Sequence, residues 1–167
     1  GNNIILCGFM GSGKTTVGTV LAERLGMELL DTDSEIVKRE NRAISEIFET
    51  DGEAYFRGLE TELIKELANK DNLIISLGGG LAAQRQNHPY LMKLGKVVLL
   101  DCGIDETLHR ITGDSTRPLT KGGKEDIVNR YNLRKSVYES VADVIIDSSS
   151  SEDKTFITAI SAIEELL

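Results

Sequence analysis

The chain has 167 residues, of which 40% are hydrophobic and 28% are charged, and its formal net charge at pH 7 is −8. This size and composition are typical of one globular domain with a substantial buried core. The acidic excess argues against nucleic-acid binding, because a phosphate backbone is bound through surplus lysine and arginine.

The sequence has neither the pattern of a signal peptide nor an apolar run long enough to span a bilayer. We therefore expect a cytoplasmic protein with no membrane partner. Cys7 and Cys102 both lie next to apolar runs, and we interpret them as small buried residues and not as a disulfide or metal pair. His88 and His109 are far apart and lack cysteine partners, so a zinc site is not expected.

Short apolar runs predict the β-strands of the chain. They are Ile4–Cys7, Leu29–Asp31, Leu73–Ser76, Val97–Asp101 and Val144–Asp147. Several of these runs lack polar alternation, as is typical of strands that are covered on both faces. Segments with helical periodicity separate the runs, which predicts a single α/β domain over residues 1–167, with a parallel sheet wrapped by helices.

The segment Gly8–Thr15 follows the first predicted strand and fits the pattern Gly, any four residues, Gly, Lys, Ser or Thr. Its glycines allow backbone N–H groups to turn inward around a phosphate, and the following helix, which ends at Gly26, adds the positive end of its dipole. Lys14 supplies a cation for the β and γ phosphates, and the hydroxyl of Thr15 can bind Mg²⁺. The segment therefore predicts a binding site for a nucleoside triphosphate.

Two carboxylates, Asp31 and Asp33, follow the second predicted strand. Ligands of open parallel sheets lie beyond the carboxyl ends of the strands, which is also where the P-loop lies. One carboxylate can hold Mg²⁺ through water while the other accepts the proton of an attacking hydroxyl. Alternatively, Asp33 is the N-cap of a helix over Ser34–Arg39, and the two roles are compatible.

Arg57 lies beside a predicted buried helix face that is marked by Phe56, Leu59 and Leu63. Glu60 follows three residues later and can pair with Arg57, which would fix the guanidinium or form only a surface ion pair.

The glycines 78–80 follow the third predicted strand, where a backbone N–H can approach a substrate or where the chain only makes a tight turn. Arg134, on a predicted helix over Glu125–Ser140, is ambiguous by itself.

The segment Thr112–Lys124 is rich in glycine and cations and has almost no apolar residues. It is either a solvated loop or a lid that closes over a nucleotide.

Together these motifs resemble the shikimate kinase family. The residues that carry the resemblance, over about Asn3 to Asp147, are the P-loop, Asp31–Asp33, Phe56-Arg57, the glycines 78–80, Arg117-Pro118-Leu119, and Arg134 with Tyr138. The resemblance implies a nucleoside-monophosphate-kinase-like P-loop fold, three-layered, with a five-stranded parallel sheet, a lid at about 112–124 and a substrate-binding helical region at about 33–62. It also implies transfer of a phosphoryl group from ATP, with Mg²⁺, to the 3-hydroxyl of shikimate, on the route to chorismate and the aromatic amino acids.

The resemblance also implies a role for individual residues. The ATP-binding residues would be Gly11, Ser12, Gly13, Lys14, Thr15, Thr16 and Arg117; the shikimate-binding residues would be Asp33, Arg57, Gly79 and Arg134; and the Mg²⁺ ligands would be Thr15 and, through water, Asp31. Catalysis would rest on Lys14, Arg117 and Asp33, the last as the base. The loop after the fifth strand contains no arginine, so Arg110 is our candidate to face the adenine.

Other acceptors and roles remain open on sequence grounds. The chain could instead be another small-molecule kinase of the same fold, such as a gluconate kinase or a nucleoside monophosphate kinase. The set of Asp33, Arg57 and Arg134 favours a carboxylated polyol over a nucleotide as the acceptor. A non-catalytic regulatory relative that binds nucleotide is a further alternative, against which the intact Lys14 and Thr15 argue. We expect the protein to act as a monomer.

Overall fold

A computed structural model describes residues 2–112, 123–149 and 152–166. In chain order the described elements are β1 (Asn3–Cys7), α1 (Lys14–Leu25), β2 (Glu28–Asp31), α2 (Thr32–Glu40), α3 (Ile44–Asp51), α4 (Glu53–Leu67), β3 (Leu73–Ser76), the 3-10 helix η1 (Arg85–Asn87), α5 (His88–Leu94), β4 (Gly95–Asp101), α6 (Gly103–Thr112), α7 (Gly123–Val141), β5 (Val144–Asp147) and α8 (Glu152–Leu166).

The five strands form one parallel sheet in the order β2-β3-β1-β4-β5. This confirms the predicted α/β fold and all five predicted strands. The main difference is that β4 begins at Gly95, two residues before the predicted start at Val97.

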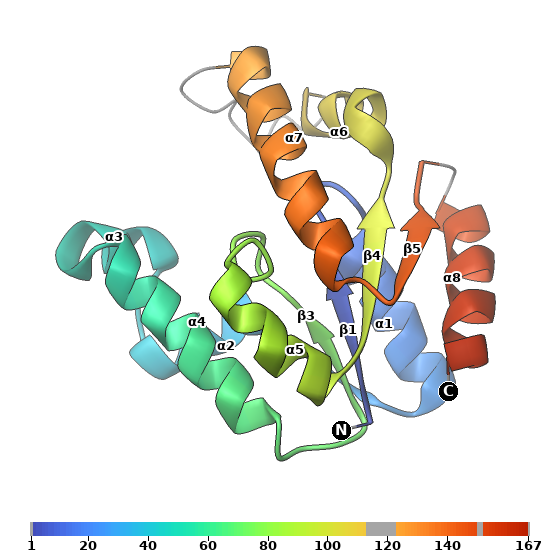
Figure 1. The fold of residues 1–167 in the computed structure, drawn as a ribbon, viewed down its shortest axis with the longest axis horizontal. Helices are drawn as coiled ribbons and strands as arrows, with labels where there is room; N and C mark the ends of the chain where they lie inside the picture. The colour runs from blue at the N-terminus through green and yellow to red at the C-terminus, as the bar shows by residue number, and fades with distance from the viewer. Residues whose placement is uncertain (1, 113–122, 150–151, 167) are drawn as a thin grey trace.

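Helices cover both faces of the sheet (Figure 1). On one face, Ile4, Leu6 and Val98 pack in a buried cluster with residues of α1 and α8. On the other face, Ile5 and Leu99 pack in a larger cluster to which α2 to α7 all contribute. Successive residues of one strand therefore enter two different cores, which explains why these strands lack polar alternation.

The carboxyl ends of the strands all lie at one edge of the sheet (Figure 1). At this edge β2 ends in Asp31, which pairs with Ser76 of β3, and β4 ends in Asp101, which pairs with Asp147 of β5. The loop after β1, the helix α6 and the first part of α7 lie beyond the same edge, and the rest of α7 runs back beside the sheet. None of the described helices is long and apolar enough to cross a membrane.

Candidate active site

The loop between β1 and α1 has the backbone geometry of a phosphate cradle. Gly11 and Gly13 adopt φ angles of 78° and 98°, a left-handed region that favours glycine. The N–H of Ser12 donates to the carbonyl of Phe9 at 3.1 Å, which closes a turn. α1 then begins at Lys14, so its free N–H groups and the positive end of its dipole point at the loop. This arrangement fits the predicted phosphate site.

Lys14 is the first residue of α1, and its side chain reaches back to the start of this loop. Its Nζ donates to the carbonyl oxygen of Gly8 at 2.7 Å. Burial lowers the pKa of Lys14, and the nearby carboxylates of Asp33 and Asp31 oppose that change. The cation of the P-loop and both predicted carboxylates therefore share one electrostatic environment.

The two carboxylates after β2 have different local roles. Asp31, and not Asp33, is the N-cap of α2, because its backbone is extended and its side chain accepts a hydrogen bond from the N–H of Ser34 at 2.9 Å. The alternative in which Asp33 caps the helix is therefore wrong. Asp33 lies in the first turn of α2 instead, where its carboxylate is not occupied in capping.

Burial, and then the charge of Asp31, raises the pKa of Asp33 above its ordinary value. Lys14 and Arg57 act in the opposite direction by stabilising the charged form. A carboxylate whose pKa is raised above its ordinary value is a stronger proton acceptor, and the nearby cations favour its charged form.

Each of the glycines 78–80 lies against a side chain from a distant part of the sequence. A Cβ added at Gly78 would overlap the carboxylate of Asp33. A Cβ at Gly79 would lie 3.2 Å from Nη1 of Arg134. A Cβ at Gly80 would overlap the guanidinium of Arg57. The three glycines thus let one carboxylate and two guanidinium groups converge on the turn after β3.

Thr32 holds this turn in place and was not singled out from the sequence. It is fully buried, and its hydroxyl oxygen accepts a hydrogen bond from the N–H of Gly78 at 2.8 Å. The only sequence signal was a small hydroxyl residue between the two aspartates at the end of a strand.

The ion pair between Arg57 and Glu60 is confirmed, with Nη1 and Oε1 at 2.8 Å. It is not a surface pair, because the side chain of Glu60 is only 1% exposed. The buried residues of α4 include Glu60, whereas Leu59 is only partly buried. This corrects the prediction that Leu59 marks the buried face. Burial raises the pKa of Glu60 to about 7, although the guanidinium of Arg57 favours the charged form. Within the described chain, the second oxygen of Glu60 has no hydrogen-bond partner.

Arg134 projects from α7 toward the same turn. Its guanidinium lies 5.9 Å from the centre of the Phe9 ring, in the P-loop. One helical turn further on, the hydroxyl of Tyr138 donates to the carbonyl oxygen of Gly79. Arg134 therefore lies between the P-loop and the glycine turn, which the sequence alone could not show.

Arg110, on α6, joins its own helix to the P-loop and to the segment after β5. Its guanidinium donates to the carbonyl oxygens of Gly11 at 2.8 Å and of Ser148 at 2.6 Å, and it pairs with Glu106 at 3.0 Å. Ser148 directly follows β5, so Arg110 stands beside the loop in which the adenine contacts were expected.

Some predicted features cannot be placed. Arg117, and the part of the predicted lid from 113 to 122, lie outside the described residues. Among the described residues there is no group of three or more His, Cys, Asp or Glu side chains that could hold a metal ion. Cys7 and Cys102 are both free and buried, as predicted.

The comparisons with known proteins agree with one another. The family model for shikimate kinase matches residues 10–164. The chain belongs to the shikimate kinase family. A shikimate kinase from Sulfurihydrogenibium sp. is 41% identical over 165 residues, which cover 99% of this chain and 95% of that protein. One from Persephonella marina is 42% identical over 146 residues, or 87% of this chain and 88% of that protein.

Solved structures of the family superpose over nearly the whole chain. The crystal structure of shikimate kinase from Aquifex aeolicus has a TM-score of 0.86 at 36% identity, and the match covers 97% of this chain and 96% of that one. Shikimate kinase from Acinetobacter baumannii, in complex with shikimate, has a TM-score of 0.85 at 35% identity and covers 98% of this chain and 92% of that one. The predicted family and fold are therefore confirmed.

Proposed function

We propose that this protein transfers the γ-phosphoryl group of ATP to the 3-hydroxyl of shikimate, giving shikimate 3-phosphate and ADP. The observation that carries the proposal is the convergence of Asp33, Arg57 and Arg134 on the glycine turn, next to the P-loop. The two guanidinium groups can bind a carboxylate, the carboxylate of Asp33 can bind hydroxyls, and the adjacent P-loop can hold phosphates. Membership of the shikimate kinase family supports the same substrate pair.

The two arginines would bind the carboxylate of shikimate. A guanidinium presents planar, paired N–H donors that match the two oxygens of a carboxylate. Arg57 is held by Glu60, and Arg134 is placed against the Phe9 ring, so both guanidinium groups are oriented before the substrate arrives. Pre-orientation reduces the entropy that binding would otherwise cost. A nucleoside monophosphate offers no carboxylate to this pair, and gluconate offers one on an open chain and not on a ring.

Asp33 would hold and deprotonate the 3-hydroxyl. The hydroxyl oxygen forms a bond to the γ-phosphorus, the bond between that phosphorus and the β–γ bridging oxygen breaks, and ADP leaves. The hydroxyl proton moves to the carboxylate of Asp33, whose raised pKa suits it to accept a proton.

The P-loop would hold the phosphates of ATP through Gly11 to Thr16, with Lys14 moving from the carbonyl of Gly8 to the transferred phosphoryl group. Mg²⁺ usually keeps several waters and takes one or two protein oxygens, so the hydroxyl of Thr15 and, through water, Asp31 fit the ion. When bound, Mg²⁺ would neutralise charge on the phosphates. Arg110 would meet the adenine side, and Arg117 would reach the phosphates from a lid at about 112–124.

The test is ADP release from the purified protein with ATP and one acceptor at a time. We expect release to depend on shikimate and to stay at background with gluconate, with AMP or with no acceptor. The product should carry the phosphoryl group on the 3-hydroxyl, as judged by phosphorus NMR. Release with gluconate or AMP but not with shikimate would contradict the proposed substrate, and no release with any acceptor would favour a regulatory relative.

A further inference from the structure

Two buried tyrosines of α7 lie one helical turn to either side of Arg134. Tyr131 precedes it by three residues and Tyr138 follows it by four, so all three share one face of the helix. Tyr131 is 6% exposed and Tyr138 is 2% exposed. The hydroxyl of Tyr138 is bound to the glycine turn, whereas the hydroxyl of Tyr131 has a different partner.

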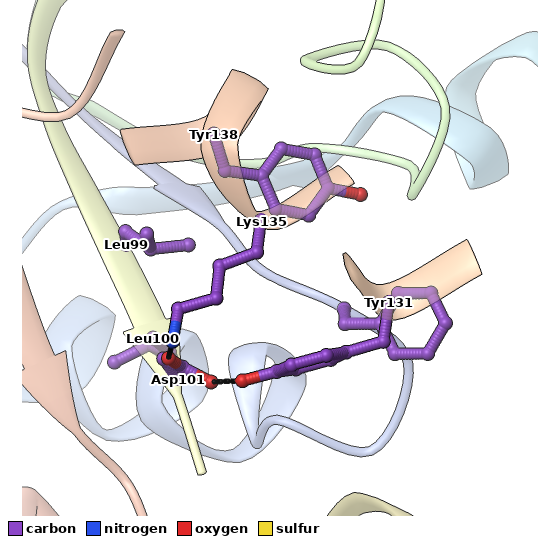
Figure 2. A pocket seen from close by; sticks show the side chains of 7 residues that line it. Leu99, Leu100, Asp101, Tyr131, Lys135 and Tyr138 are labelled. Atoms are coloured by element: carbon purple, nitrogen blue, oxygen red, sulfur yellow. Dashed lines mark hydrogen bonds and ion pairs between the residues drawn. The ribbon is translucent and has the colours of Figure 1, made fainter. Parts of the chain in front are cut away.

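The hydroxyl of Tyr131 is directed at the end of β4. It donates to Oδ1 of Asp101 at 2.8 Å, and the amino group of Lys135 lies 3.9 Å from Oδ2 of the same carboxylate (Figure 2). Oδ1 of Asp101 also accepts from the N–H of Gly103, the first residue of α6, at 2.9 Å. A single carboxylate therefore joins β4, α6 and α7.

The ring of Tyr131 reaches the P-loop. It packs edge-on against Phe9, with ring centres 5.7 Å apart and an interplanar angle of 81°. The guanidinium of Arg134 approaches the same Phe9 ring at 5.9 Å. Tyr131 and Arg134 thus contact one P-loop side chain, so the placement of α7 on β4 also sets the position of Arg134 beside the P-loop.

We propose that Asp101 and Tyr131 are positioning residues, which fix α7 so that Arg134 meets the carboxylate of shikimate. This inference rests on the proposed substrate role of Arg134. Arginine has a long side chain with many rotamers, so its guanidinium is placed accurately only if the helix beneath it is fixed within about 0.5 Å. A hydrogen bond to a charged acceptor is stronger than one between neutral groups. Burial and the carboxylate of Asp101 raise the pKa of Tyr131, so the hydroxyl remains a donor.

A simpler possibility is that the pair only stabilises the fold. Tyr131→Phe separates the two, because it removes the hydroxyl and keeps the ring against Phe9. We expect it to weaken shikimate binding about ten-fold, the effect of losing one hydrogen bond to a charged group, and to leave ATP affinity unchanged. Asp101→Asn keeps an acceptor without the charge, and we expect a smaller loss. Tyr90→Phe is the matched control, because Tyr90 lies on α5 with the centre of its ring 5.1 Å from the amino group of Lys65, outside the proposed substrate-binding region, and should not affect shikimate.

The deciding experiment is a double-mutant cycle with Arg134→Ala, in which NMR titration measures the dissociation constant of shikimate for each folded variant. If Tyr131 acts through Arg134, Tyr131→Phe should weaken binding about ten-fold in the wild type and less than about two-fold in the Arg134→Ala background, because coupled residues are not additive. Equal losses in both backgrounds, or no loss in the wild type, would overturn the inference and leave the proposed function intact. If Arg134→Ala alone does not weaken binding, the proposed role of Arg134 fails, and the inference fails with it.

Discussion

Gly80 faces the guanidinium of Arg57 so closely that a methyl group on Gly80 would occupy the same space. Arg57 comes from α4 and Gly80 from the turn after β3, so the glycine allows two distant segments to meet. The absence of a side chain at Gly80 is therefore a condition for the position of Arg57, which in turn is proposed to bind the substrate.

The first prediction concerns this contact. Gly80→Ala should displace Arg57 and raise the KM for shikimate about ten-fold or more, because the ion pair with a substrate carboxylate would be distorted. The KM for ATP should change little. Gly58→Ala is the control, since a Cβ on Gly58 would meet no atom within 4 Å, and alanine in a helix is more stable than glycine by about 1 kcal/mol. Unchanged shikimate kinetics in Gly80→Ala would show that Arg57 has room to shift.

The second prediction concerns the base. Asp33→Asn removes the proposed proton acceptor while keeping a side chain of the same shape, so kcat should fall by about 100-fold or more. ATP binding, measured by calorimetry, should be close to that of the wild type, because the phosphates are proposed to bind to the P-loop and not to Asp33. A mutant with nearly normal turnover would remove Asp33 from the chemistry.

The third prediction concerns pH. The pKa of Glu60 is raised in the folded state to about 7 from an ordinary value of 4.5, so protonation of Glu60 favours the folded protein. This contribution to stability is complete below pH 4.5 and is lost as the pH rises through about 7. Between pH 5 and pH 8 the melting temperature of the wild type should therefore fall relative to that of Glu60→Gln, which does not titrate. Parallel melting curves for the two proteins over this range would contradict the assignment.

The fourth prediction concerns Thr32. Thr32→Val leaves the buried N–H of Gly78 without its acceptor, which should lower the free energy of unfolding by about 1–3 kcal/mol. Thr32→Ser keeps the hydroxyl and should lose less. Urea denaturation measures both values. If valine is tolerated better than serine, the methyl group of Thr32 matters more than its hydroxyl.

Much of the fold and the loop geometry of the proposed phosphate site could be predicted from the sequence because each depends on local patterns. Apolar runs identify strands that are covered on both faces, and the spacing of Gly8, Gly13 and Lys14 identifies the loop that follows β1. Both depend on residues that are close together in the chain. Family resemblance added the order of the remaining motifs.

The features that could not be predicted depend on contacts between distant segments. The need for glycine at positions 78–80 arises only because side chains of α2, α4 and α7 all converge on one turn. Our prediction named Asp33 and not Asp31 as a candidate cap of α2, and local patterns could not correct this, because both residues are aspartates and aspartate is a good N-cap. Glu60 is the exception that periodicity could have found, since it lies four residues from both Phe56 and Ile64 on the buried face of α4, but its charge suggested exposure.

The most direct test of the central claim compares shikimate with its carboxamide, which has the same ring and hydroxyls but no negative charge. If Arg57 and Arg134 bind the carboxylate, the wild type should prefer shikimate by about 100-fold or more in kcat/KM, since unpairing one partner of a charge pair costs about 2–5 kcal/mol. Arg57→Ala and Arg134→Ala should each lose most of that preference by acting on shikimate alone. A wild-type enzyme that uses both acceptors equally well, or mutants that keep the full preference, would contradict the account.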